Sequence, residues 1–114
     1  FTSFLILTAF ASVSEAKTIY VPDDYARIQW AVDNASAGDT IIVRDSVYVE
    51  NIDINKPYLT IKSENGSAKC VVKAANSNDH IFYVTADNVT IKGFTVTGAY
   101  WKAGIYLHNL NKVE

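Results

Sequence analysis

The sequence contains no methionine, a single cysteine, two prolines and five glycines. The one cysteine, Cys70, cannot form a disulfide within the chain, and we expect it to be a small buried apolar residue rather than a reactive thiol. Because translation starts at methionine, its absence predicts that these 114 residues are a fragment or a trimmed product. A chain of this length holds one domain at most.

An excess of charge of either sign is also absent. The chain carries 12 acidic and 10 basic side chains, a net charge of −2, and 49% of its residues are apolar. These values argue against a disordered chain and against a basic surface that binds nucleic acid. They are typical of a globular domain.

The first 16 residues have the order of a secretory signal peptide. Residues 1–14 carry no charge and include an apolar run, and Ser14-Glu15-Ala16 then places small residues one apart. This order predicts cleavage after Ala16, a mature chain of residues 17–114 and a secreted, periplasmic or cell-surface location. The run is too short for a membrane span, which needs about 20 apolar residues. The alternative is that it forms a buried first strand of the domain.

Only one stretch has the period of an α-helix, and it follows Pro22. Asp23 and Asp24 are predicted to cap its first amides, and Gly38 to end it in a left-handed conformation. Four apolar residues at positions i, i+3, i+4 and i+7 predict a helix of about three turns with one buried stripe, formed by Ile28, Ala31, Val32 and Ala35.

After Asp39 the apolar residues alternate with polar ones in short runs rich in β-branched side chains. No second helical period follows, and the hairpin signal Asn-Gly occurs once, so a meander of tight hairpins is disfavoured. The predicted strands are residues 40–43, 47–49, 52–54, 59–62, 70–73, 81–84, 89–92, 94–97 and 105–107.

Similar segments recur along these strands. The offset is 30 positions for one pair of segments and about 24 for two others, which indicates a solenoid with three short strands in each coil of about two dozen residues. Residues 59–62 recur as 89–92, residues 70–73 as 94–97, and residues 81–84 as 104–107.

Five segments resemble the start of right-handed parallel β-helix proteins, namely Thr18-Ile19-Tyr20-Val21-Pro22, Ile28-Gln29 with Ala31-Val32, residues 37–43, Tyr48-Val49-Glu50-Asn51-Ile52 and Leu59-Thr60-Ile61. These segments are most similar to those of NosD-type periplasmic copper-binding proteins and of surface proteins with carbohydrate-binding and sugar-hydrolase repeats. Pectin methylesterases and pectate lyases resemble it more distantly.

This resemblance spans residues 18–109 and implies an all-β, pectin-lyase-like solenoid. In that fold the short helix would cover the apolar end of the first coil, and the chain would form about three coils. Since the sequence stops just after a new strand, we expect further coils of the same chain at its C-terminus. The resemblance indicates a fold and no catalytic site.

Catalysis by lyases, hydrolases or esterases of this fold needs clustered carboxylates. The acidic pairs in the sequence are Asp23 with Asp24 and Asp45 with Glu50. The first pair lies at the predicted helix start and the second beside a turn, so capping and solvation account for them. We predict no catalytic residue in this part of the chain.

Copper binding, which the NosD-type resemblance implies, needs several His, Met or Cys side chains around one ion. The candidates are His80, His108 and Cys70, and the two histidines lie at opposite ends of the matching strand repeats. We therefore expect solvated histidines, no metal site and no cofactor.

Tyr100 and Trp101 are the candidate carbohydrate-binding residues. They follow Thr97-Gly98-Ala99 in a predicted loop, and an exposed flat ring can stack on the apolar face of a sugar. The alternative is that both rings pack beneath the loop. Trp30 lies off the helical stripe and is expected to cover the join between the helix and the first coil.

Three sequons, at Asn34, Asn65 and Asn88, are candidate glycosylation sites if the protein is exported by a glycosylating route. Asn65 is the best candidate because its insertion should be exposed. Asn88 lies at a corner before a strand, where Asn tolerates the left-handed conformation, so it has a competing structural role.

The favoured hypothesis is an exported, non-catalytic β-helix module of the cell surface with a structural or glycan-binding role. Its expected partner is a polysaccharide or a cell-surface glycan. Neither nucleic acid nor a membrane-spanning segment of the mature part is expected. One alternative is a carbohydrate-active enzyme whose acidic residues lie on later coils, and another is a copper-delivery accessory protein.

Overall fold

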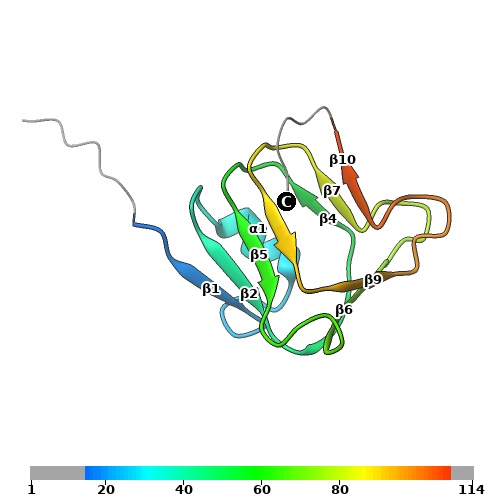
Figure 1. Ribbon diagram of the computed structural model, residues 1–114, viewed down its shortest axis with the longest axis horizontal. Coiled ribbons are helices and arrows are strands. Elements are labelled where there is room, and N and C mark those ends of the chain that lie inside the picture. Colours follow the sequence, from blue (N-terminus) through cyan, green and yellow to red (C-terminus); the bar gives the residue numbers. More distant parts are fainter. Residues whose placement is uncertain (1–14, 109–114) are drawn as a thin grey trace, which may run out of the picture.

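The computed structural model describes residues 15–108 (Figure 1). The predicted signal peptide lies almost wholly outside this part, as do residues 109–114. Within it the order of elements is β1 (Thr18–Val21), α1 (Ile28–Asn34), β2 (Thr40–Val43), β3 (Ser46–Val49), β4 (Ile52–Ile54), β5 (Thr60–Ser63), β6 (Cys70–Lys73), β7 (Phe82–Val84), β8 (Thr90–Lys92), β9 (Thr95–Thr97) and β10 (Ile105–Leu107). Every predicted strand is present, and no end moves by more than one residue.

Every strand pairing in the described part is parallel, and the strands form three sheets. Their orders are β1-β2-β5-β8, β3-β6-β9 and β4-β7-β10. The three sheets lie on different sides of the molecule (Figure 1). Because each strand pairs with its equivalent in the next coil, the chain winds in one direction. The predicted parallel β-solenoid is therefore confirmed, with three full coils above a partial coil made of β1 and α1.

The strand registers follow the sequence repeats. Thr60 pairs with Thr90, Val71 with Thr95, and Phe82 with Ile105. Such in-register stacking places like side chains above one another, so each coil covers the apolar face of the previous one.

One apolar core runs along the inside of the coils. Alternating positions of the strands point inward, and in the first two full coils the apolar side chains at these positions are buried, most of them completely, as for Ile41, Val43, Ile52, Ile54, Ile61, Val72, Phe82 and Val84. Cys70 belongs to this set, which confirms it as a buried apolar residue. Burial raises the pKa of its thiol to about 11.

The helix α1 covers the end of the solenoid that precedes the first full coil. Its stripe of Ile28, Ala31 and Val32 is buried, as is Ala35 just beyond its last residue. α1 packs against β1, β2 and β4, and it lies behind β5 in Figure 1. The prediction of a helix that caps the first coil is confirmed.

The predicted capping residues of α1 are wrong. The helix begins at Ile28, too far along the chain for Asp23 or Asp24 to reach its first amides. Asp24 instead accepts a hydrogen bond from the Tyr20 amide (2.8 Å). Gly38 does have a positive φ of 96°, but it lies in the connection to β2. The helix itself ends at Asn34, with Ala35 in an extended conformation.

The cap of α1 comes from the coil above it. The carboxylate of Glu50 accepts hydrogen bonds from the amides of Ile28 (2.9 Å) and Gln29 (3.0 Å). At the other end, the Lys56 ammonium donates to the carbonyls of Val32, Asp33 and Ala35. These opposite charges flank β4 and complement the dipole of the helix.

The side chain of Gln29 pairs with the free edge of β4. Its Oε1 accepts from the Asp53 amide (2.7 Å) and its Nε2 donates to the Asp53 carbonyl (3.1 Å). One amide side chain therefore occupies the place of a neighbouring strand at that edge.

Candidate functional site

Tyr100 and Trp101 lie in the loop between β9 and β10, and their side chains are 79% and 81% exposed. The alternative in which both rings pack beneath the loop is wrong. Two adjacent, exposed aromatic side chains on a corner of the solenoid offer flat apolar surface to a ligand.

Stacked corner loops position this aromatic loop. Asn51 donates to the carbonyls of Asn76 (3.1 Å) and His80 (2.9 Å) in the loop between β6 and β7. That loop then holds the next one, since the Tyr100 amide donates to the Ser77 carbonyl (3.1 Å).

His80 anchors the far end of the aromatic loop. The Ala103 amide donates to Nδ1 of His80 (3.0 Å), and the Ile81 amide donates to the Ala103 carbonyl (3.2 Å). The sequence did not predict this role, because the contact joins residues of two successive coils.

Four aromatic rings form a ladder on the outer face of the β4-β7-β10 sheet. Tyr83 and Tyr106 occupy paired positions on β7 and β10, and their ring centroids are 5.6 Å apart. His80 stacks on Tyr106 at 4.2 Å, and the His108 ring lies 6.2 Å from that of Tyr83. The rings of His80, Tyr83 and Tyr106 stack face to face, whereas the His108 ring lies at 63° to that of Tyr83. The ladder therefore joins the coils, and its Tyr106 is less exposed than Tyr100 and Trp101.

The histidines and the cysteine do not converge on one point. His80 and His108 contact the tyrosine ladder, whereas Cys70 is buried in the core. Among residues 15–108, no group of three or more His, Cys, Asp or Glu side chains is arranged to hold a metal ion.

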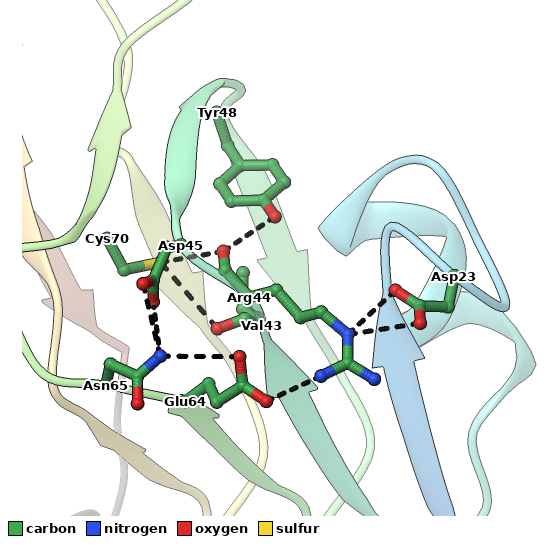
Figure 2. Close-up of polar contacts among 8 residues, drawn as sticks. All are labelled: Asp23, Val43, Arg44, Asp45, Tyr48, Glu64, Asn65 and Cys70. Atoms are coloured by element: carbon green, nitrogen blue, oxygen red, sulfur yellow. Dashed lines mark hydrogen bonds and ion pairs between the residues drawn. The ribbon is translucent and has the colours of Figure 1, made fainter.

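Ion pairs tie three successive turns together at the corner after β2 (Figure 2). Nε of Arg44 donates to both carboxylate oxygens of Asp23 (2.9 and 3.1 Å), and another guanidinium nitrogen donates to Glu64. The guanidinium also lies 4.6 Å from the centre of the Tyr20 ring. The hydrogen bond from Arg44 lowers the pKa of Asp23.

The inner side of the same corner is closed by two protonated groups. The Tyr48 hydroxyl donates to the Arg44 carbonyl (2.8 Å), and the Cys70 thiol contacts the carbonyls of Val43 and Arg44 (Figure 2). Desolvation raises the pKa of Tyr48 to about 12. Both groups therefore stay neutral at physiological pH and act as donors.

The candidate acidic pairs do not form an acid–base site. Asp45 accepts from the Asn65 amide group (3.0 and 3.1 Å), whereas Glu50 binds the start of α1. The cap that Glu50 forms was not predicted, and the expectation that Glu50 is solvated is wrong, because the residue is only 6% exposed.

The three sequons differ in their surroundings. Asn65 and Asn34 are exposed, and the Asn34 amide group donates to the Trp30 carbonyl (2.9 Å). Asn88 is partly buried and has a φ of 60°, which confirms the left-handed corner. Trp30 itself is half exposed, and the Arg27 guanidinium lies 5.4 Å from the centre of its ring.

These features define a class of protein: a parallel β-solenoid with a helical lid and an exposed aromatic loop at one corner. No helix in the described part is long and apolar enough to span a membrane.

Comparison with known proteins adds one relative. The chain is 38% identical, over 106 residues and 91% of its length, to the cell surface glycoprotein of Methanothermus fervidus. It spans 17% of the length of that relative. No family model matches the chain. No solved structure matches it either.

Proposed function

We propose that this chain is a non-catalytic module of an exported cell-surface protein, with a structural role. The observation that carries the proposal is the 38% identity, over 91% of the chain, to a protein named cell surface glycoprotein. The polar groups are consistent with a structural role, since Glu50 caps a helix and Asp23 and Glu64 bind Arg44. The resemblance to pectin-lyase-like and NosD-type proteins supports the same solenoid and contributes no functional residue.

The location is tested by labelling intact cells with an impermeant amine reagent. Lys69 and Lys102 are exposed in the structure and should be labelled without lysis. A cytoplasmic protein of the same cells serves as the control and should remain unlabelled. Labelling of Lys69 and Lys102 only after lysis would contradict the proposal.

The signal peptide is tested on the same exported protein. N-terminal sequencing should find a chain that begins at Lys17, because the small residues Ser14 and Ala16 precede it. Retention of residues 1–16 would favour the alternative in which they belong to the domain.

Glycan contact by Tyr100 and Trp101 is a second candidate function, and the high exposure of both rings favours it. A rigid ring exposed on a held loop can stack on a sugar without a large conformational change. On a glycan array, Trp101→Ala should lose most of the binding of the unmodified chain. Trp30→Ala removes another exposed tryptophan from a different element and should bind as the unmodified chain does. An equal signal from Trp101→Ala would exclude this role.

The enzymatic and copper alternatives predict particular residues outside the described part. Aspartates that recur at one coil period would favour a carbohydrate-active enzyme, and clusters of Met and His would favour copper delivery. No contact within residues 15–108 favours either.

A further inference from the structure

The inward side chains of the last coil are uncovered. Ile105 and Leu107 are 44% and 46% exposed, whereas Phe82 and Val84, which pair with them one coil below, are completely buried. Ile91 is also partly exposed, although its partner Ile61 is not. The same apolar positions therefore change from core to surface at this end of the molecule.

At the other end of the described coils, α1 covers the core. α1 buries its apolar stripe there, Gln29 pairs with the edge of β4, and Glu50 and Lys56 bind the two ends of the helix. Among residues 15–108, dedicated contacts thus close one end, and apolar core positions are exposed at the other.

The backbone at the uncovered end has a definite geometry. β8, β9 and β10 are each the last described strand of a sheet, so each presents one edge of unpaired amides and carbonyls. The three edges lie on three sides of one core, and β5, β6 and β7 are already covered in this way, in parallel and in register.

We propose that a further three-stranded parallel coil of the same polypeptide covers β8, β9 and β10. It would continue an interface that recurs between all the full coils. The chain spans only 17% of the length of its relative, so a polypeptide as long as that relative has room for more coils. The inference concerns the fold and holds whether or not Tyr100 and Trp101 bind a glycan.

A second copy of this chain fits the same surface less well. To present its own open end it must turn over, and such a two-fold rotation can keep only one of the three sheets opposite its own copy. Each of the other two edge strands would then face the strand of the wrong sheet in the second copy, and all pairings would be antiparallel. A following coil instead matches three edges at once.

The contacts also specify the side chains of the covering coil. Its inward residues are apolar where they lie over Ile91, Val96, Ile105 and Leu107. A planar side chain is expected over Tyr106, since Tyr83 and Tyr106 already form a ladder of stacked rings.

Thiol labelling tests the inference on the complete native polypeptide that carries this sequence, purified from its own cells. Leu107→Cys should react at least about 100-fold more slowly than Val47→Cys, because a buried thiol reacts only after local opening. Val47 is an exposed residue of β3 and provides the matched control. Cys70 gives little background, since it is completely buried.

Ile105→Cys repeats the measurement at a second inward position, so that a folding defect of one variant does not decide the result. Fast labelling of both positions in the complete polypeptide would overturn the inference. Protection that disappears on dilution would also overturn it, because a second copy would then be the cover.

Discussion

At the scale of single residues, the most informative side chain is the buried carboxylate of Glu50. It accepts two hydrogen bonds from α1, at the end of the helix where the dipole is positive. Helices of seven residues are marginal by themselves, and this one receives its cap from a strand connection in the next coil. A carboxylate that looks like a candidate acid in the sequence is thus a structural acceptor.

The substitution Glu50→Gln should lower the free energy of unfolding by about 1–3 kcal/mol, because a glutamine can accept only one of the two hydrogen bonds and places an NH₂ group against the other amide. Urea unfolding at neutral pH measures the loss. Glu64→Gln, in an exposed ion pair with Arg44, is the control and should cost about 1 kcal/mol or less. Equal losses in the two variants would contradict the capping role.

Glycosylation is a second prediction at the residue scale. If the exporting cell glycosylates sequons, mass spectrometry should find glycan on the exposed Asn65 and Asn34 and not on the partly buried Asn88. Ser67→Ala should remove the glycan of Asn65 and leave that of Asn34, because it destroys only one sequon. A glycan on Asn88 would show that the corner opens during export.

At the scale of elements, the connection between α1 and β2 depends on Asp39. Its buried carboxylate accepts from the amides of Ser36 (2.8 Å) and Lys17 (2.9 Å), which ties this turn to the start of β1. Desolvation alone would raise its pKa. The two amides, together with the charges of Lys17 and Lys56, outweigh that effect and lower the pKa below its usual 3.8.

This lowered pKa predicts the sign of a pH dependence. The carboxylate stabilises the fold fully above about pH 4, and its contribution is lost as the pH falls through the lower pKa of the folded state. The free energy of unfolding of Asp39→Asn should therefore lie below that of the unmodified chain by a constant amount between pH 7 and pH 5. The difference should shrink below about pH 4. Asp53→Asn, at an exposed position, is the control in urea titrations at each pH.

At the scale of the whole molecule, the described coils have one end that α1 covers and one end at which inward side chains are exposed. Each coil is stabilised only by its neighbours, so the local free energy of opening should fall toward the end that lacks one. The exposure of Ile105 and Leu107 marks that end.

Hydrogen exchange of the 114-residue chain should reveal this gradient. Amides of β9 and β10 are expected to exchange at least about tenfold faster than those of β2 and β5, which have a coil on both sides. Peptide-resolved mass spectrometry at neutral pH measures both sets in one sample. A uniform rate across all coils would indicate that the chain opens as one cooperative unit and would contradict the gradient.

Particular residues show how far the sequence predicted the structure. The strands, the buried stripe of α1 and the left-handed Asn88 all follow from local period and residue type. The exposure of Tyr100 and Trp101 does not, because a loop sequence gives no sign of whether its rings turn inward. The anchoring of that loop by His80 was also missed, since the two partners lie on different coils.

The sequence by itself determined that short parallel strands repeat along a coil, because apolar and polar residues alternate within the strands and similar segments recur at a regular spacing. Only the tertiary structure decided which side chains meet between coils. Glu50 reaches Ile28, Lys56 reaches Val32, and Gln29 reaches Asp53 across one full turn of the solenoid. A local sequence pattern does not predict these contacts, because they depend both on the lengths of the corner loops and on the register in which the coils stack.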